Sequence, residues 1–383
     1  MMRTLFQVML VLPGLVGFTA DGDQQERQKK QLYAVSPGGT LEVHLASGNI
    51  RIGGWDRNEV LVQTPDFSEE QQDQLRISRS GTTLRIEYWG GGSHDGDVTI
   101  RVSVPAKFNV SAETGGGNIE IRGPLNGEIA GATAGGEVRL VSLGGTVRMS
   151  TSGGDIDAGD IEGTLELSSM GGEIHTGTVS GKTEISTGGG DVEVERAKND
   201  LDISTAGGNI RVGDVGGTLS AFTAGGDIEI RKTTGHISLN TAGGSVSVGS
   251  APKGITVRTA GGDLALRNIG GMIEAKTGGG NIEVSFAPGT LKESRISTGA
   301  GDIRLLIPPG LKATVKVEIR GSGYSDQQDD QVIQSDFKVE SRTWDDRTGA
   351  FRATIQLNGG GEDVVVVTGE GLVRIVSSKK PGK

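Results

Sequence analysis

Aliphatic and polar residues alternate along most of the chain, in short runs that are separated by glycine. The segment 226–244 (GDIEIRKTTGHISLNTAGG) is typical of this pattern. Ile228 and Ile230 alternate with charged residues, and Ile237 and Leu239 alternate with polar residues after a second turn. Because successive side chains of a strand point to opposite faces, each such unit predicts two short strands and two turns.

The unit recurs at a constant spacing. From Glu137 to Asn281, the residue that follows each glycine pair recurs every 18 residues. A fixed period of this size is typical of solenoids, in which each coil packs against its neighbours. We therefore expect an all-β fold: a single-stack β-solenoid of 18-residue coils with two short strands per coil. The residues that follow the pairs are Asn118, Glu137, Asp155, Glu173, Asp191, Asn209, Asp227, Ser245, Asp263, Asn281 and, after Ala300–Gly301, Asp302.

Stacking the units aligns their aliphatic residues in two expected core columns. The first column consists of Val138, Ile156, Ile174, Val192, Ile210, Ile228, Val246, Leu264 and Ile282. The second consists of Leu165, Leu201, Leu219, Ile237, Ile255 and Ile273. At the corners, we expect the glycine pairs to supply positive φ angles and the following Asp or Asn to close an Asx-type turn.

Aromatic residues gather at the two ends, whereas Phe222 is the only one between residues 112 and 284. A solenoid must cover its open edges, so this distribution predicts aromatic-rich amino- and carboxyl-terminal caps. The first residues resemble an export signal, because Arg3 precedes an apolar run at 5–18 that is short for a membrane span; a retained anchor is the alternative. The expected order is a signal peptide (1–20), a polar linker (21–31), an N-terminal cap with the first coils (32–111), the repeat array (112–305), a C-terminal cap (306–376) and a basic tail (377–383).

Composition narrows the possible functions. The chain of 383 residues has no cysteine, which excludes disulfides, thiolate metal sites, a cysteine nucleophile and a lipid-modified cysteine. Its formal net charge of −10, without a concentrated basic surface, argues against a nucleic-acid partner. We expect no integral membrane span once the signal is removed.

Several short motifs together resemble the bacterial putative-adhesin family, whose members are exported proteins with glycine-rich β-solenoid domains of unknown function. The motifs are SerGlyAsnIle at 47–50 with GlyTrpAsp at 54–56, the strand at 102–105 before the first glycine pair, the repeated ThrAlaGlyGlyAsp units and AsnGlyGly at 358–360. The resemblance covers most of residues 32–376 and implies an envelope or surface protein. It supplies no catalytic residues.

Acidic side chains provide the first candidate site. Asp155, Glu173 and Asp191 fall in one turn column, beside an outward column that contains Asp157, His175 and Glu193. A divalent cation would relieve the repulsion between stacked carboxylates, but solvated turn residues are the preferred interpretation. Calcium-binding nonapeptide repeats need a second glycine and an aspartate where this chain has an aliphatic residue. We therefore expect no metal site, no cofactor and no large effect of calcium.

Catalysis has weak support in the sequence. The four histidines are His44, His94, His175 and His236, and the last two fall in different columns. Polysaccharide-cleaving β-helix enzymes use carboxylates and basic residues on one outer sheet, so the enzyme alternative rests on the outward column Asp157, His175, Glu193, Arg211 and Glu229. Such enzymes build a groove from long loops, which the array lacks. We expect no enzyme and predict no catalytic residues.

Two further motifs have simpler explanations. The glycine triplets that end at Gly117, Gly190 and Gly280 lack the lysine and the helix of a phosphate-binding loop. A threonine ladder suggests an ice-binding face, but its residues share the parity of the core and should point inward, forming hydrogen bonds along the stack. The ladder consists of Thr133, Thr151, Thr187, Thr205, Thr223, Thr241, Thr259 and Thr277.

The preferred hypothesis is a non-enzymatic, adhesin-like protein that is exported and is periplasmic, secreted or associated with the cell surface. It would bind a repetitive envelope ligand, a polysaccharide or a protein, along the array. A structural or stress-associated envelope scaffold that acts through its caps is the alternative.

Overall fold

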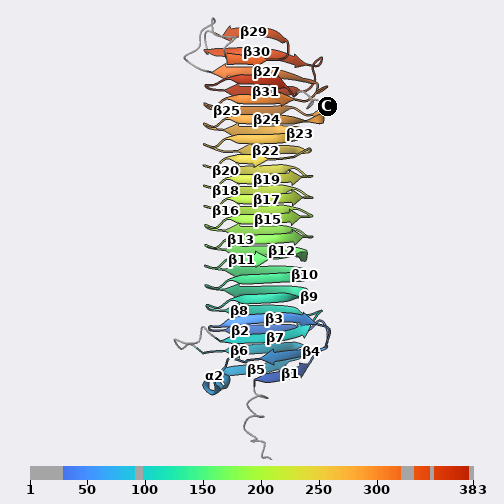
Figure 1. Ribbon diagram of the computed structural model, residues 1–383, viewed down its shortest axis with the longest axis vertical. Coiled ribbons are helices and arrows are strands. Elements are labelled where there is room, and N and C mark those ends of the chain that lie inside the picture. Colours follow the sequence, from blue (N-terminus) through green and yellow to red (C-terminus); the bar gives the residue numbers. More distant parts are fainter. Residues whose placement is uncertain (1–28, 91–97, 321–331, 346–348, 379–383) are drawn as a thin grey trace, which may run out of the picture.

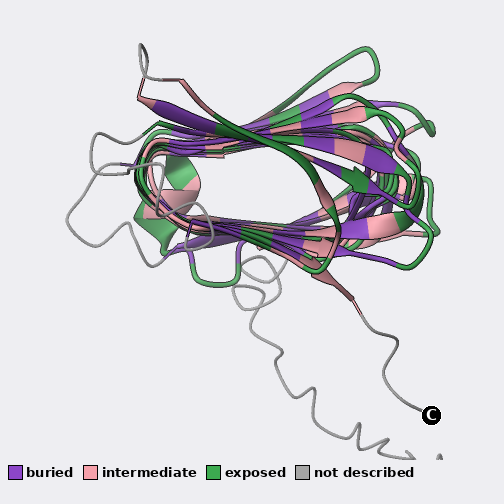
Figure 2. Ribbon diagram, turned by 90° about the horizontal axis from the view of Figure 1, so that it is seen from above, coloured by how far each residue is buried: buried purple, intermediate pink, exposed green. Residues whose placement is uncertain are grey.

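The computed structural model describes residues 29–90, 98–320, 332–345 and 349–378. These residues form one long stack of strands (Figure 1). Viewed along the stack, two layers of strands face each other and corners join them on both sides (Figure 2). The expected signal peptide, most of the linker and most of the basic tail lie outside the described residues.

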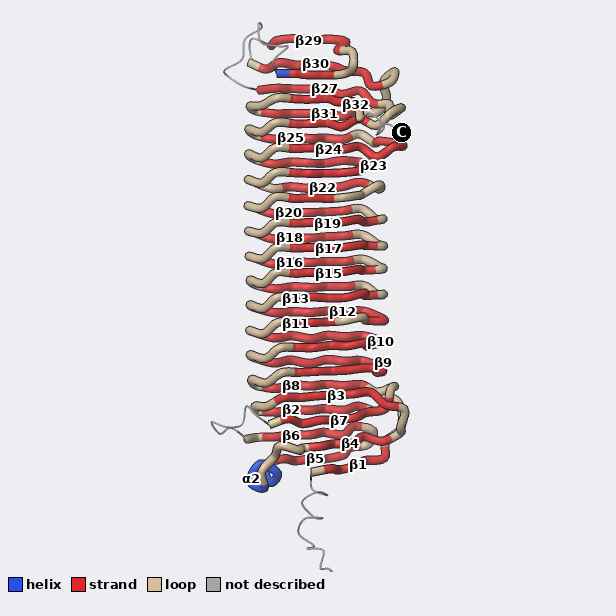
Figure 3. The backbone as a smooth tube through the Cα atoms, viewed as in Figure 1, coloured by secondary structure: helices blue, strands red, loops and turns tan. Residues whose placement is uncertain are grey.

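Strands follow one another from one end of the stack to the other, with loops at the corners between them (Figure 3). The elements of the amino-terminal end are β1 (Lys30–Ala34), β2 (Thr40–Leu45), β3 (Asn49–Trp55), β4 (Glu59–Gln63), α2 (Glu69–Asp73), β5 (Leu75–Ser80), β6 (Thr83–Tyr88), β7 (Thr99–Pro105) and β8 (Asn109–Thr114).

The array follows as β9 (Ile119–Thr133), β10 (Val138–Thr151), β11 (Ile156–Ala158), β12 (Ile161–Ser169), β13 (Ile174–Val179), β14 (Thr183–Thr187), β15 (Val192–Ala197), β16 (Leu201–Thr205), β17 (Ile210–Val215), β18 (Leu219–Thr223), β19 (Ile228–Thr233), β20 (Ile237–Thr241), β21 (Val246–Val248), β22 (Gly254–Arg258), β23 (Leu264–Thr277), β24 (Ile282–Leu291), β25 (Ser294–Thr298) and β26 (Ile303–Ile307). The carboxyl-terminal end comprises β27 (Ala313–Arg320), β28 (Ile333–Ser335), β29 (Val339–Asp345), β30 (Ala350–Leu357), β31 (Asp363–Thr368) and β32 (Val373–Ser377). The all-β prediction is confirmed.

Pairing within the array is parallel and in register. In one layer Ile210 of β17 pairs with Ile228 of β19, one repeat unit later. In the other layer Leu201 of β16 pairs with Leu219 of β18, at the same spacing. Equivalent residues of successive coils therefore stack directly on one another. The spacing widens where Ile282 pairs with Ile303, because β24 carries extra residues between Phe286 and Leu291.

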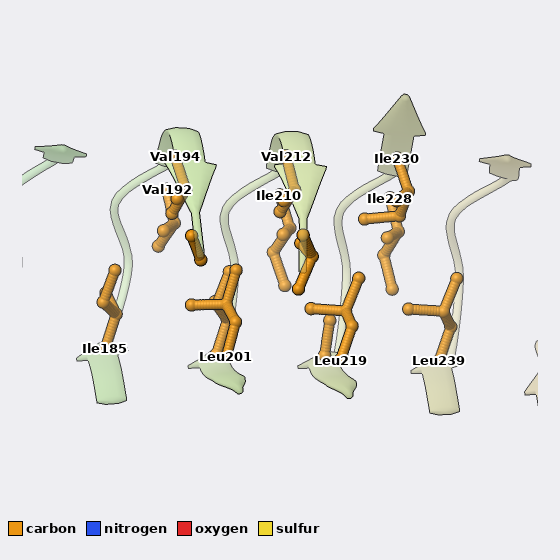
Figure 4. Close-up of a cluster of buried hydrophobic side chains, with 14 of the residues drawn as sticks. Ile185, Val192, Val194, Leu201, Ile210, Val212, Leu219, Ile228, Ile230 and Leu239 are labelled. Carbon is orange, nitrogen blue, oxygen red and sulfur yellow. The ribbon is translucent and has the colours of Figure 1, made fainter. Parts of the chain in front are cut away.

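The two expected core columns are confirmed. All fifteen of their side chains are at most 2% exposed. Figure 4 shows core side chains from the two layers pointing toward each other between successive coils. Each fully buried aliphatic side chain contributes about 1.5–3 kcal/mol of gross burial, so the stability of the stack accumulates coil by coil.

The layers are less separate than two short strands per coil would imply. β9, β10 and β23 each continue through a corner and contribute to both layers, with 15, 14 and 14 residues. In β10, Val138 pairs with Ile156 of one layer and Val147 with Leu165 of the other. At these corners the backbone keeps strand pairing while it turns.

Both ends of the stack interrupt the constant repeat of the array. Leu41 of β2 pairs with Val110 of β8, so the first coil stacks directly on the coil that begins near residue 109. The segment between them extends below, where β6 pairs with β2 and β7 with β3. At the other end Ile303 of β26 pairs with Val373 of β32, and β27, β29 and β30 lie beyond (Figure 1). Each end is thus an insertion between two coils that touch.

Aromatic side chains lie at both ends, but the described ones do not form larger clusters. The rings of Phe67 and Tyr88 lie 5.0 Å apart at the lower end. Trp89, in contrast, is 70% exposed. At the upper end Trp344 pairs across the strands with Phe351. α2, whose capping box is formed by Ser68 and Gln71, lies beside the lower edge of the stack.

Candidate functional site on the outward faces of the array

The glycine pairs do not serve the purpose that the sequence suggested. In the pairs that precede the polar residues from Asn118 to Asn281, neither glycine has a positive φ angle. The second glycine is required because coils approach closely at the corner: a Cβ on Gly226 would lie 2.1 Å from the carbonyl oxygen of Gly208. The first glycine has room, since a Cβ on Gly225 would meet nothing closer than 3.5 Å. The corner is therefore fixed by the distance between backbones.

The threonine ladder points inward and joins the coils, as predicted. The hydroxyl of Thr223 donates to the carbonyl oxygen of Gly208 (2.9 Å) and accepts from the N–H of Gly226 (3.1 Å). Thr241 repeats both bonds one coil later. Each buried hydroxyl thus satisfies two backbone groups that would otherwise be unpaired at the corner.

The short polar residue after most glycine pairs also joins coils, which corrects the expected Asx-type turn. The carboxylate of Asp227 accepts from the N–H of Ser245 (2.7 Å), at the equivalent position of the next coil. The side-chain oxygen of Asn209 likewise accepts from the N–H of Asp227 (2.9 Å). The longer side chains of Glu137 and Glu173 make no such bond within the described residues. Short acceptors at this position are therefore part of the scaffold.

The acidic turn column follows the same rule. Asp155 accepts from the N–H of Glu173 (2.8 Å), and Asp191 accepts from the N–H of Asn209 (2.7 Å). These aspartates are engaged with the next coil. In the described part of the chain, no group of three or more His, Asp or Glu side chains is placed to hold a metal ion.

The outward column that the sequence indicated does form a continuous line. Its members pair in register from one strand to the next, in the order Asp157, His175, Glu193, Arg211 and Glu229. Strands in a ladder lie about 4.8 Å apart, so the acidic side chains alternate with His175 and Arg211 at that spacing. His236 precedes β20 in the opposite layer, and His94 lies outside the described residues.

A depression of about 670 Å³ interrupts this surface over β15, β17 and β19. Its charged lining consists of Glu193, Glu195, Arg196, Arg211, Glu229 and Arg231. The side chains of Glu193 and Glu195 are 59% and 63% exposed, and that of Arg231 is 65% exposed. The depression is therefore open to water. The enzyme alternative requires walls that desolvate a general acid, and the exposed lining of this depression does not provide them.

Ion pairs order one side of the depression. A single carboxylate oxygen of Asp214 lies 2.9 Å from Arg231 and 3.4 Å from Arg196, which approach from the two neighbouring strands. His175 lies at the other side, with its ring nitrogens 4.0 Å from Glu193 and from Glu195. Exposed pairs of this kind contribute little to stability, about 0–1 kcal/mol each.

Comparison with known proteins adds the family. The model of the Toastrack DUF4097 family matches residues 22–253 and 198–361, which together span most of the chain. The chain belongs to this family. This match confirms the expected resemblance. No curated protein matches the chain.

Several solved structures are similar to the chain. A putative adhesin from Parabacteroides merdae is 15% identical, with 62% of this chain and 94% of that chain covered and a TM-score of 0.35. A putative lipid binding protein from Parabacteroides distasonis is 18% identical, with coverage of 60% and 95% and a TM-score of 0.34. A putative cell adhesion protein from Clostridium sporogenes is 10% identical, with coverage of 91% and 99% and a TM-score of 0.17.

Sequence reasoning found only part of the depression. Glu193, Arg211 and Glu229 belong to the predicted column, but Glu195, Arg196 and Arg231 do not. The available signal was Gly213, an outward position of β17 that falls between Glu195 and Arg231 when the repeat units are aligned. Gly213 leaves a gap between these two charged side chains on the outward face.

Proposed function

We propose that this chain is a non-enzymatic, adhesin-like protein that is exported to the envelope or cell surface, where it binds a repetitive ligand, a glycan or a protein, along the solenoid. One observation carries the proposal: outward side chains of successive coils stack in register, as in the column from Asp157 to Glu229. A regular surface of this kind offers the same contacts repeatedly to a ligand that itself repeats.

The expectation of export rests on the amino-terminal sequence, where Arg3 precedes the apolar run at 5–18. No helix in the described part of the chain is long and apolar enough to cross a membrane.

A second candidate is a structural or stress-associated envelope scaffold that acts through its ends. It is favoured by the position of the irregular segments, which are inserted at the two ends of the stack while the array between them stays uniform. In that case the array would serve as a spacer.

In-register deletions separate the two candidates. Deleting residues 137–172 or 191–226 removes two coils and rejoins equivalent positions of the corner. If the array is the binding surface, each deletion weakens binding to envelopes isolated from the producing cells, and deleting both weakens it further. Full binding by the double deletion variant, with circular dichroism showing an intact β-fold, would refute the array as the binding surface and favour the scaffold. Cross-linking in intact cells would then identify the partner.

A further inference from the structure

Gly213 lines the depression over β15, β17 and β19 and leaves its centre without a side chain. Gly213 of β17 lies between strands that carry Glu195 and Arg231 at the corresponding positions. The guanidinium of Arg231 extends over Gly213, where a Cβ would lie 3.5 Å from one of its nitrogens. A side chain at residue 213 would also clash with the backbone, since its Cβ would lie 2.0 Å from the carbonyl oxygen of Glu195. The gap is thus built into the packing of the coils.

Charges of opposite sign balance around this gap. The lining contains three glutamates and three arginines, so their formal charges cancel. Arg196 and Arg231 are committed to Asp214. Arg211 lies between Glu193 and Glu229 in register, yet it forms no ion pair among the described residues. Its guanidinium donors therefore remain available to a ligand.

We propose that this depression binds an uncharged, polyhydroxylated sugar unit of a glycan, an inference that rests on the proposed function and specifies its ligand. A sugar hydroxyl both donates and accepts, so it can donate to a glutamate carboxylate while it accepts from Arg211. Alternating donors and acceptors about 4.8 Å apart match several hydroxyls of one unit. A polyanion would meet the three glutamates and a polycation would meet the unpaired guanidinium of Arg211, and each repulsion opposes binding.

One such site binds weakly. The side chains are open to water and, within the described residues, no aromatic ring lines the depression to stack on a sugar face. Useful affinity then requires a long chain that contacts further outward residues of neighbouring coils, which raises the effective concentration at each contact. The inference therefore concerns a polymeric glycan.

The test measures binding of the full chain to immobilised polysaccharides by biolayer interferometry. The neutral probes are dextran, mannan and galactan; polygalacturonate is the acidic probe and chitosan the basic one. Arg211→Met removes the free donors and leaves the ion pairs of Asp214 intact. Its matched control is Arg258→Met, which removes an exposed arginine of β22 in the opposite layer, paired with Glu274.

We expect binding to at least one neutral polysaccharide and a loss of about tenfold in affinity for Arg211→Met, with Arg258→Met unchanged. Deleting residues 191–226 removes Gly213 and should abolish this binding, whereas deleting 137–172 should retain most of it. Preference for the acidic or basic probe, or no binding to any neutral one, would overturn the inference. If the two deletions lower the affinity equally and Arg211→Met leaves it unchanged, the proposed subsite is refuted. The array would then still be the binding surface.

Discussion

The two glycines of each pair should respond differently to the same substitution. Gly226→Ala introduces a Cβ 2.1 Å from the carbonyl oxygen of Gly208 and 2.5 Å from its carbonyl carbon. Gly225→Ala introduces one whose nearest neighbour is 3.5 Å away. The chain already contains the second kind of change, because Ala300 takes the first position before Gly301.

The cost of Gly226→Ala follows from the geometry of the corner. Relieving the contact requires the two coils to separate locally by about 1 Å or more. Such a shift strains the bonds that converge on Gly226, from its N–H to Thr223 (3.1 Å) and from the hydroxyl of Thr241 to its carbonyl oxygen (2.9 Å). Overpacking costs about 1–3 kcal/mol and one weakened hydrogen bond about 1 kcal/mol more, so we expect a loss of about 2–4 kcal/mol. Gly225→Ala should be neutral or stabilise by up to about 1 kcal/mol, by restricting the unfolded chain.

Two measurements check this prediction. Urea unfolding followed by far-ultraviolet circular dichroism compares the midpoints of both variants with the parent. Because a solenoid can open locally, hydrogen exchange at the amides of residues 226–244 shows whether the loss is confined to the altered coils. Equal destabilisation by both substitutions would show that the backbone conformation, and not the approach of the coils, requires glycine. An unchanged midpoint and unchanged exchange for Gly226→Ala would refute the steric argument.

Two further predictions concern polar groups. The hydroxyl of Thr176 is buried and has no hydrogen-bond partner among the described residues, so Thr176→Val should stabilise the fold by about 1 kcal/mol. Thr223→Val removes two hydrogen bonds and should cost about 1–3 kcal/mol. Urea unfolding compares the stabilities of the two variants, and equal effects would contradict the assigned roles of the two hydroxyls. The backbone N–H and then the hydroxyl of Thr218 lower the pKa of Asp200. Because the folded-state pKa is lower than the unfolded one, this stabilisation is complete above about pH 4 and is lost as pH falls through the folded value. Thr218→Val should raise that pKa partway in an NMR titration of Asp200, and no change would exclude the hydroxyl as a cause.

The repeated part of the fold could be predicted from the sequence because each coil repeats the same physical problem. Alternation at positions such as Ile228 and Ile230 defines the inward face, and the constant spacing of the units defines which residues stack. The inward threonines follow from the same parity. Parallel, in-register pairing follows from this alternation and this spacing alone. The predicted outward column that contains Arg211 is therefore also confirmed.

Other features depend on distances that no pattern contains. The role of Gly226 is set by the approach of two backbones, and glycine is equally compatible with a positive φ angle when only the sequence is considered. The ends could not be predicted because the pairing of Leu41 with Val110 skips the segment between them. Local alternation gives each strand but not its partner when the constant period fails.

The corner contacts also explain why binding should depend on so few positions. The second glycine, the threonine and the short polar residue of each unit are engaged with the neighbouring coil, as Gly226, Thr223 and Asp227 are. Changing any of them alters the stack itself. Only the outward residues between the corners can vary without disturbing the packing of the coils, and at Gly213 even one of these is constrained by the adjacent backbone. The surface available for recognition is therefore the set of outward columns, and Arg211 is the member of its column that lines the depression with free donors.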